Sequence, residues 1–127
     1  MSKKRILIID DEADIAGALK FFLEKTGMYE VQIEQLGQAG IEAAETFRPD
    51  LILLDVMMPD MDGGDVAAQI GENKATNRIP IVFLTAAVTK EEVDAQGGTI
   101  GERPVLSKMT SLEQLIAYVK KALEVVS

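Results

Sequence analysis

The sequence contains no cysteine, no histidine and no tryptophan. The lack of cysteine excludes disulfide bonds and thiolate catalysis, and the lack of histidine excludes Ser–His catalytic triads and a phosphohistidine within this chain. Zinc finger sites, which combine these two residue types, are excluded as well. The chemistry that remains is that of carboxylates, hydroxyls and lysine amines.

Basic residues are in the minority, and long apolar segments are missing. The 13 lysine and arginine residues against 21 aspartate and glutamate residues give a formal net charge of −8, which disfavours binding to nucleic acid or anionic lipid. The basic N-terminus is followed by a short apolar run, residues 6–9, that ends at Asp10, too early for a signal peptide or a membrane span. We therefore expect a cytoplasmic protein that neither inserts into a membrane nor binds DNA directly.

The chain does have enough apolar residues for a core. Its 127 residues, 47% of them hydrophobic, suffice for one compact domain, and short apolar runs alternate with longer segments of helical periodicity. The continuous apolar runs predict central parallel strands at residues 6–9, 51–54 and 81–84. Residues 29–35 alternate between apolar and polar and predict an edge strand, and residues 105–107, which follow a proline, predict the other edge.

Two sequence patterns indicate where helices begin. Thr110-Ser111-Leu112-Glu113 and Thr89-Lys90-Glu91-Glu92 both match the capping box, in which a hydroxyl and an acid satisfy free amides at a helix start. The apolar positions between residues 112 and 123 make the last helix the clearest in the chain. The helix after Thr89 is expected to be short or mobile, because a glycine-rich segment, 97–101, follows it and glycine costs about 1 kcal/mol inside a helix.

Five reactive side chains fall at the carboxyl ends of the predicted strands, where ligands of open parallel sheets bind. They are Asp10, Asp11, Asp55, Thr85 and Lys108. Carboxylates packed together raise one another's pKa unless a cation is present, so the three aspartates indicate a divalent metal, and oxygen ligands favour Mg²⁺ or Mn²⁺. A lysine ammonium and a hydroxyl beside such a metal describe a site for phosphoryl oxygens. The predicted ligand is a phosphoryl group.

Four motifs, taken together and in order, resemble the receiver domain of two-component response regulators over nearly the whole chain. They are Ile8-Ile9-Asp10-Asp11-Glu12, Leu54-Asp55-Val56-Met57-Met58-Pro59-Asp60-Met61-Asp62-Gly63, Pro80-Ile81-Val82-Phe83-Leu84-Thr85-Ala86 and Leu106-Ser107-Lys108. The resemblance implies an α/β fold of the doubly wound (βα)5, flavodoxin-like type, with a five-stranded parallel sheet of order 2-1-3-4-5. It also predicts a single receiver domain over residues 1–127, without an effector domain or linker.

The resemblance implies a role for each carboxylate of the cluster. Asp55 would be the phosphoacceptor, which attacks the phosphohistidine of a sensor histidine kinase or a histidine phosphotransfer protein. Asp11 would bind magnesium directly, Asp10 mostly through a water, and the backbone carbonyl of Met57 would supply a further oxygen, while the metal keeps several waters. The phosphorylated domain would signal to a downstream protein target by contact or pass its phosphoryl group on, with no enzyme activity beyond this phosphotransfer and slow self-dephosphorylation.

The other residues implied by the resemblance bind the phosphoryl group itself. Lys108 would pair with one phosphoryl oxygen, and the Thr85 hydroxyl and the Ala86 amide would bind the others. Neutralising charge on these oxygens is most of what a protein contributes to phosphoryl transfer. The resemblance also implies that the side chains of Met57 and Ala87 flank the site and modulate loss of the phosphoryl group. Both are uncharged and unable to orient water, so we expect this loss to be slow.

Two positions depart from the family pattern. Val105 stands three residues before the lysine, where the family usually has an aromatic residue, and it is too small to swing between inward and outward positions. Met109 stands where the family usually has a proline, often after a cis peptide bond, and a non-proline cis bond costs about 3 kcal/mol. These changes predict a remodelled output face around the last strand and its flanking helices.

Several of these residues also have purely structural interpretations. Asp11 fits the N-cap of the following helix. Asp60 and Asp62 fit a polar turn before the third helix. Thioether ligands would contradict an oxygen site, so packing and loop positions are expected for Met57, Met58 and Met61.

The sequence leaves alternative functions open. One is a pseudo-receiver, an interaction module that keeps the fold without phosphorylation, and another is a receiver fragment of a larger regulator. A flavin carrier shares the topology, but the chain lacks a Ser/Thr/Gly-rich phosphate loop after its first strand. A magnesium phosphohydrolase would use Asp55 as nucleophile, yet no second general acid is present. The complete set of Asp11, Asp55, Thr85 and Lys108 favours the phosphorylated receiver.

Overall fold

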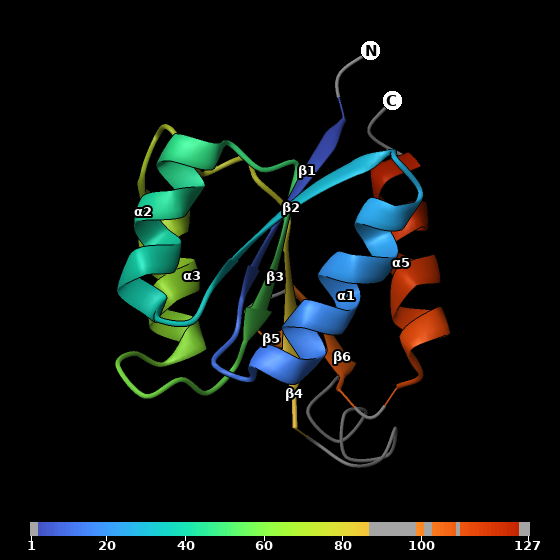
Figure 1. The fold of residues 1–127 in the computed structure, drawn as a ribbon. Coiled ribbons are helices and arrows are strands. Elements are labelled where there is room, and N and C mark those ends of the chain that lie inside the picture. Colours follow the sequence, from blue (N-terminus) through green and yellow to red (C-terminus); the bar gives the residue numbers. More distant parts are fainter. Residues whose placement is uncertain (1–2, 87–98, 101–102, 109, 125–127) are drawn as a thin grey trace.

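A parallel sheet forms the centre of the molecule. The computed structural model describes residues 3–86, 99–100, 103–108 and 110–124. The parallel strands lie in the order β2-β1-β3-β4-β6 (Figure 1), which confirms the predicted order 2-1-3-4-5. They are β1 (Lys4–Ile9), β2 (Tyr29–Glu34), β3 (Leu51–Asp55), β4 (Ile81–Thr85) and β6 (Arg103–Ser107).

A two-residue strand, β5 (Thr99–Ile100), lies outside β6 and pairs with it in the antiparallel direction. The prediction that the last parallel strand forms the edge of the sheet is therefore wrong. Only two residues separate β5 from β6, a connection long enough for a hairpin but far too short for a parallel crossover. Two residues carry no periodicity, so the sequence pattern missed this strand. The helix expected after Thr89 lies outside the described residues.

Helices cover both faces of the sheet (Figure 1). One face carries α1 (Ala13–Lys25) and α5 (Leu112–Glu124), and the other carries α2 (Gly37–Phe47) and α3 (Gly63–Glu72). Along β1, Ile6 and Ile8 pack in the core under α1 and α5, whereas Leu7 and Ile9 pack in the core under α2 and α3. The two cores confirm the doubly wound architecture. Within the described residues, no helix is both long enough and apolar enough to span a membrane.

The starts of two helices differ from the sequence interpretation. Ser111, the second residue of the predicted capping box, is the capping residue of α5, because its Oγ accepts a hydrogen bond from the Gln114 amide at 3.2 Å. α1 begins after Glu12, whose side chain makes no capping hydrogen bond. The interpretation of Asp11 as the N-cap of this helix is therefore wrong, which leaves its carboxylate available to the site.

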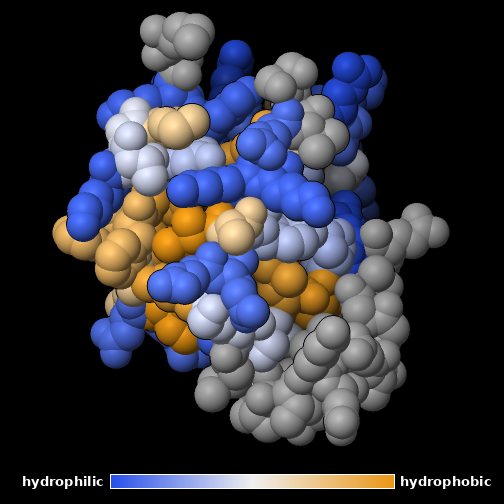
Figure 2. Space-filling model, turned by 90° about the vertical axis from the view of Figure 1, so that its right-hand side faces the viewer, coloured by the Kyte–Doolittle hydropathy of each residue, from blue (hydrophilic) through white to orange (hydrophobic). Residues whose placement is uncertain are grey.

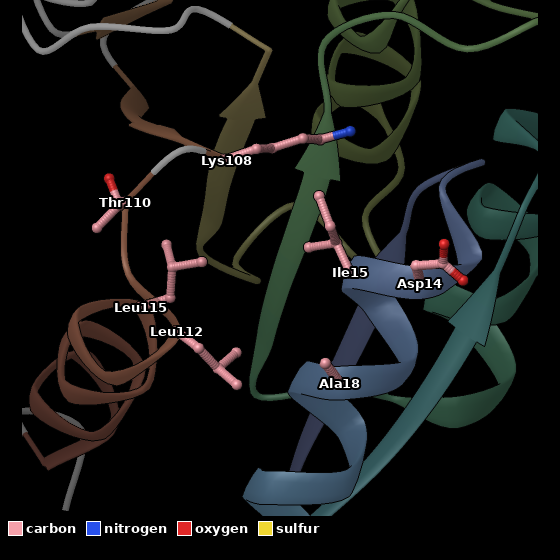
Figure 3. Close-up of a pocket in the computed structure, with 7 residues that line it drawn as sticks. All are labelled: Asp14, Ile15, Ala18, Lys108, Thr110, Leu112 and Leu115. Atoms are coloured by element: carbon pink, nitrogen blue, oxygen red, sulfur yellow. The ribbon is translucent and has the colours of Figure 1, made fainter.

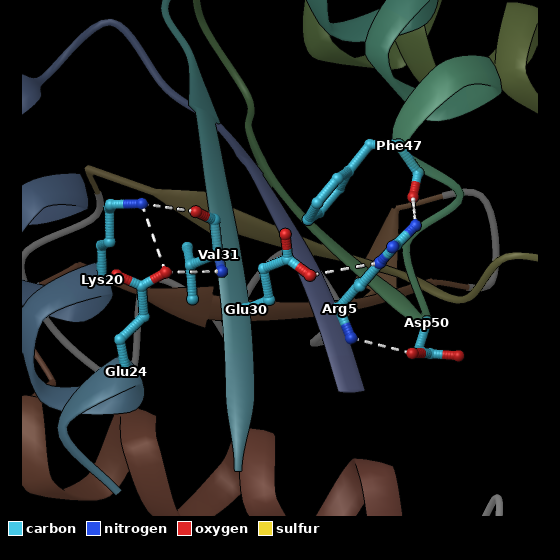
Figure 4. A network of polar contacts seen from close by, with 7 residues as sticks. All are labelled: Arg5, Lys20, Glu24, Glu30, Val31, Phe47 and Asp50. Carbon is cyan, nitrogen blue, oxygen red and sulfur yellow. Dashed lines mark hydrogen bonds and ion pairs between the residues drawn. The ribbon is translucent and has the colours of Figure 1, made fainter. Parts of the chain in front are cut away.

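Two side chains from α1 cover the outer edge of β2 (Figure 4). The Val31 N–H donates to Glu24 Oε2 at 3.0 Å, and Lys20 Nζ donates to the Val31 carbonyl at 2.6 Å. The predicted alternation is confirmed for the first half of this strand, where Tyr29 and Val31 are buried and Glu30 is exposed, whereas residues 32–34 are all partly buried. Because an unpaired strand edge is a template for association with another chain, these bonds protect the sheet at β2.

Arg5, near the amino end of β1, contacts three neighbouring segments (Figure 4). Its backbone N–H donates to Asp50 Oδ2, and its Nη1 donates to the Phe47 carbonyl, both at 2.8 Å. Its Nε also lies 3.3 Å from Glu30 Oε1. These contacts join the start of β1 to the end of α2 and to β2.

Two helical glycines are expected to respond in opposite ways to alanine. A Cβ at Gly40 of α2 would lie 2.5 Å from Ile9 Cδ1, whereas a Cβ at Gly17 of α1 would meet no atom within 4 Å. Gly40→Ala overpacks the core and should lower the free energy of unfolding by about 1–2 kcal/mol. Gly17→Ala should raise it by up to about 1 kcal/mol through higher helix propensity. Urea unfolding measures both, and equal effects would contradict the packing of α2 against β1.

Candidate functional site

The predicted reactive residues meet at the carboxyl ends of four strands. Asp10 and Asp11 follow β1, Asp55 ends β3, Thr85 ends β4 and Lys108 follows β6. Asp10, Asp55, Thr85 and Lys108 are buried, with exposed fractions of 0%, 5%, 8% and 9%, and Asp11 is exposed. The sheet thus brings all five residues to one rim and gives them different access to solvent.

Lys108 is the central cation of this rim. Its Nζ lies 3.0 Å from Asp10 Oδ1, 3.3 Å from Asp55 Oδ2 and 2.7 Å from Glu12 Oε1. Burial alone would lower the pKa of Lys108, but hydrogen bonds to Glu12 and Asp10 and the negative charges of Asp10 and Asp55 raise it above its ordinary value. Lys108 therefore stays protonated in a site whose other charged groups are acids.

Glu12 is a site residue that the sequence interpretation missed. Its carboxylate makes the shortest of the three contacts to Lys108, although its side chain is half exposed. The backbone N–H of Glu12 also donates to Asp10 Oδ1 at 2.8 Å, which ties the residue to the cluster twice. The available signal was the place of Glu12 in the acidic run Asp10-Asp11-Glu12, which does not identify Lys108 as its partner.

The three aspartates form a compact acidic cluster. One carboxylate oxygen from each of Asp10, Asp11 and Asp55 lies within 4.8 Å of the others. Burial, the charge of Asp10 and a hydrogen bond with Asp11 raise the pKa of Asp55 to about 7, against the opposing effects of Lys108 and the Met57 amide. Without a further cation, this arrangement is electrostatically unfavourable to the ionised form of Asp55.

The cluster fits a divalent metal ion that prefers oxygen ligands. Among the described residues, one buried side-chain oxygen, Asp10 Oδ2, has no hydrogen-bond partner. A buried carboxylate oxygen without a partner is costly, and an ion bound at the cluster would satisfy it. All donor groups are oxygens, which suits Mg²⁺ or Mn²⁺ better than a softer metal.

The loop between β3 and α3 carries residues next to Asp55. The Met57 N–H donates to Asp55 Oδ1 at 3.3 Å, and the Met57 side chain is 79% exposed. The packing interpretation is confirmed for Met58 and Met61, which lie partly buried against the core under α2 and α3. Gly63 begins α3, and a Cβ there would lie 2.4 Å from the carbonyl oxygen of Asp55, so only glycine fits beside the end of β3.

The two acids of this loop have different roles. The polar-turn interpretation is confirmed for Asp62, whose Oδ1 accepts the Gly64 N–H at 2.9 Å as the N-cap of α3. Asp60 instead reaches out of the turn, and its carboxylate accepts hydrogen bonds from the first amides of α2. No sequence pattern predicts this contact with α2, because residues 37 and 60 are distant in the chain.

The ends of β4 and β6 are joined beside the cluster. The Lys108 N–H donates to the Thr85 carbonyl at 2.8 Å, which fixes the base of the lysine side chain. Ala86, which follows β4, is exposed. Val105 is buried with Phe83 in the core under α2 and α3. Ala87 and Met109 lie outside the described residues.

An apolar groove of about 250 Å³ opens next to Lys108, between α1 and α5 (Figure 3). Ile15 and Ala18 line it from α1, and Leu112 and Leu115 line it from α5. On this side of the molecule hydrophobic surface lies among hydrophilic residues (Figure 2). The groove thus places apolar side chains next to the buried lysine of the site.

Comparison with known proteins identifies the family. Residues 6–120 match the family model described as the response regulator receiver domain. The chain belongs to this receiver family.

Curated relatives of this receiver domain are transcriptional regulators. It is 39% identical over 121 residues to the alkaline phosphatase synthesis transcriptional regulatory protein PhoP of Bacillus subtilis, covering 94% of this chain and 48% of the relative. It is 36% identical over 123 residues to the phosphate regulon transcriptional regulatory protein PhoB of Pseudomonas aeruginosa, covering 97% and 53%. The receiver domain thus spans about half the length of the curated relatives it matches.

Solved receiver structures share the fold. A CheY-like response regulator receiver domain protein from Methanospirillum hungatei matches with a TM-score of 0.78 at 27% identity, covering 97% of this chain and 95% of the other. The chemotaxis protein CheY4 of Vibrio cholerae matches with a TM-score of 0.79 at 26% identity, covering 94% and 98%. These findings support phosphoacceptor function in a signalling domain and do not favour the pseudo-receiver alternative.

Proposed function

We propose that Asp55 is the phosphoacceptor of this receiver domain. The observation that supports this role best is the burial of Asp55 at ion-pair distance from Lys108, inside a cluster of three carboxylates. An Asp55 carboxylate oxygen would attack the phosphorus of a partner's phosphohistidine. A new O–P bond forms as the P–N bond breaks, and the departing imidazole nitrogen keeps the electron pair of that bond.

Lys108, Thr85 and Ala86 would receive the transferred group. Lys108 Nζ already lies 3.3 Å from Asp55 Oδ2, so it can pair with a phosphoryl oxygen bound there. The Thr85 hydroxyl and the Ala86 amide, at the end of β4, would bind the remaining oxygens. Glu12 accepts a hydrogen bond from the same Lys108 ammonium and would share it with the phosphoryl group.

We further propose that the acidic cluster holds Mg²⁺, with Mn²⁺ as a possible substitute. Asp10, Asp11, Asp55 and the backbone carbonyl of Met57 would hold the ion. When bound, the ion supplies positive charge that lowers the pKa of Asp55 and offsets charge on the phosphoryl oxygens. Asp10 Oδ2, buried and without a partner among the described residues, supports this assignment.

The partner that supplies the phosphoryl group is proposed to be a sensor histidine kinase or a histidine phosphotransfer protein. Such a partner must bring an imidazole to the rim, and the apolar groove between α1 and α5 gives it a surface next to Lys108 (Figure 3). Phosphorylation would change the charge at the rim and alter contact with a downstream protein target. The net charge of −8 argues against DNA as a ligand of these 127 residues, which we propose form one receiver domain acting in the cytoplasm.

Intact-mass measurement with a small phosphodonor tests the proposed function. Wild-type protein incubated with acetyl phosphate and Mg²⁺ should gain one phosphoryl group, and chelation of Mg²⁺ should prevent the gain. Asp55→Asn should gain none, whereas Asp65→Asn, an exposed acid on α3, should behave as wild type. Equal phosphorylation of Asp55→Asn would contradict the proposal, and a folded wild type without any gain would favour an interaction module.

We expect the phosphoryl group to be lost slowly, because the exposed Met57 side chain cannot orient a water molecule. Met57→Asn introduces a hydrogen-bonding group beside Asp55 and should speed the loss about tenfold, the effect of one hydrogen bond of about 1.4 kcal/mol. The phosphorylated fraction, followed by intact mass after removal of the donor, measures the rate. Met28→Asn is the control, since Met28 is also an exposed methionine. An unchanged rate in Met57→Asn would contradict this role of position 57.

A further inference from the structure

We propose that Asp60 is a positioning residue for the metal site, because its carboxylate ties the loop between β3 and α3 to the start of α2. The inference rests on the proposed function, since it assumes that the main chain of Met57 in this loop faces a bound Mg²⁺. Asp60 itself is exposed and does not belong to the acidic cluster. Its effect on the site would pass through Met58 and Pro59, the two residues that separate it from Met57.

Asp60 binds α2 with both carboxylate oxygens. Oδ1 accepts the Gly37 N–H at 2.9 Å, and Oδ2 accepts the Gln38 N–H at 3.1 Å. The first amides of a helix have no partner within the helix, and the N-cap residue here, Leu36, has no side chain that could accept them. These two N–H groups also hold the pKa of Asp60 below its ordinary value, so the carboxylate stays ionised at neutral pH.

The start of α2 lies directly against the loop and α3. A Cβ at Gly37 would lie 2.8 Å from Val66 Cγ2 and 3.0 Å from Met61 Cβ. The backbone of Gly37 is therefore packed directly against these two side chains. Met61, next to Asp60 in the chain, is partly buried against the same core. The Asp60 contact therefore joins two segments that already pack together.

The base of the loop is closed by bonds of its own. The Gly63 N–H donates to the Val56 carbonyl at 2.8 Å, and Met57 pairs with Asp62 in an antiparallel bridge. These contacts fix the width of the loop but connect it to no other element. Among the described residues, the two hydrogen bonds of Asp60 link the loop tip to the start of α2.

The orientation of Met57 matters because its amide already donates to Asp55 Oδ1 at 3.3 Å. Its carbonyl is the one main-chain oxygen proposed as a metal ligand. Groups that orient metal ligands from outside the ligand set commonly change metal affinity by about 10–100-fold when removed. Loss of the Asp60 anchor should therefore weaken Mg²⁺ binding while leaving Asp55 and Lys108 in place.

Calorimetric titration of unphosphorylated protein with Mg²⁺ tests this inference. Asp60→Ala should raise the Kd for Mg²⁺ about tenfold, and the acetyl phosphate reaction at saturating Mg²⁺ should stay within about twofold of wild type. Asp60→Asn keeps one acceptor oxygen and should give an intermediate Kd. Asp65→Ala, which removes an exposed acid of α3, controls for the change in charge and should leave the Kd unchanged.

Gln38→Pro breaks the same link from the other side. Proline removes the N–H that Asp60 Oδ2 accepts and is tolerated in the first turn of a helix, so the fold should persist. A raised Kd in this variant, similar to that of Asp60→Asn, supports the link itself as the cause. Thermal unfolding without metal shows whether a variant merely loses helix stability, which would lower Tm and leave the Kd unchanged.

The outcomes separate this inference from the proposed function. A wild type that binds Mg²⁺, with Asp60→Ala binding equally well, overturns the role of Asp60 and leaves the phosphoacceptor intact. A wild type that binds no Mg²⁺ contradicts the metal site and this inference together. A wild type that binds Mg²⁺ but takes up no phosphoryl group contradicts the proposed function, while a raised Kd in Asp60→Ala still supports the positioning role.

Discussion

Lys108→Met is expected to lower the free energy of unfolding by about 3 kcal/mol at pH 8 without metal, since removing one partner of a buried ion pair leaves an uncompensated charge. Lys108 is 9% exposed and holds the carboxylates of Asp10 and Asp55, which are themselves buried. Methionine keeps most of the volume of the lysine side chain, so the decrease in the free energy of unfolding reflects the missing charge more than lost packing.

The pH dependence of this variant shows whether its loss of stability comes from charge or from packing. Burial raises the pKa of Asp55 to about 7, so protonation of this carboxylate removes one uncompensated charge and the difference between Lys108→Met and wild type should shrink toward pH 5. Lys120→Met, at an exposed position on α5, should change the free energy of unfolding by less than about 0.5 kcal/mol. A Lys108→Met variant as stable as wild type at pH 8 would contradict the described ion pairs.

The same variant should lose most phosphoryl uptake from acetyl phosphate at saturating Mg²⁺. Lys108 is the side chain placed to pair with a phosphoryl oxygen on Asp55, and one charge-assisted hydrogen bond is worth about 1.5–3 kcal/mol. The expected decrease in rate is therefore about 10–100-fold. Intact mass at several times after mixing measures it.

Asp55→Asn should abolish phosphorylation and stabilise the protein in the absence of metal. The pKa of Asp55 is raised to about 7 from an ordinary value of 3.8. Between these values the folded state keeps a proton that the unfolded state releases, so wild-type stability falls as pH rises from about 4 to about 7. The full pKa shift corresponds to a contribution of at most about 4 kcal/mol to the free energy of unfolding. This contribution is fully lost above pH 7.

Asparagine at position 55 removes this titration. We expect Asp55→Asn to be more stable than wild type by on the order of 2 kcal/mol at pH 8, after discounting its weaker contact with Lys108. The difference should vanish near pH 4. Mg²⁺ should raise the Tm of wild type at pH 8, chelation should reverse this, and Asp55→Asn should respond less.

Thermal unfolding between pH 4 and pH 8 checks the pH dependence, with Asp65→Asn as a control for loss of an exposed acid. A wild-type curve that rises over this window, or a destabilised Asp55→Asn at pH 8, would show that the Asp55 carboxylate is ionised at no cost in the folded state. That result would remove the electrostatic reason for a metal.

Much of this site could be predicted because it depends on where strands end. The apolar runs that become β1, β3 and β4 stop at Asp10, Asp55 and Thr85, and parallel strands bring their carboxyl ends to one edge. The short strand before Lys108 completes the set. Strand length and apolar content are local properties, so both can be recognised from the sequence alone.

The features that the sequence did not reveal depend on pairs of distant residues. Glu12 reaches Lys108 across 96 positions, and Asp60 reaches the start of α2 across 22 and 23. No periodicity marks such contacts, because each is a single side chain whose partner is set by packing. The strand β5 escaped prediction for a different reason, since its two residues are too few to show a periodicity and the strand is recognised by its pairing with β6.

The most direct test of the central claim locates the phosphoryl group in the chain. Wild-type protein is phosphorylated with acetyl phosphate and Mg²⁺ and then reduced with borohydride, which converts an aspartyl phosphate to homoserine, and the product is mapped by peptide mass spectrometry. The account predicts homoserine at position 55 and at no other aspartate. Homoserine at Asp10 or Asp11, or a phosphoryl group retained on a hydroxyl such as that of Thr85, would contradict it.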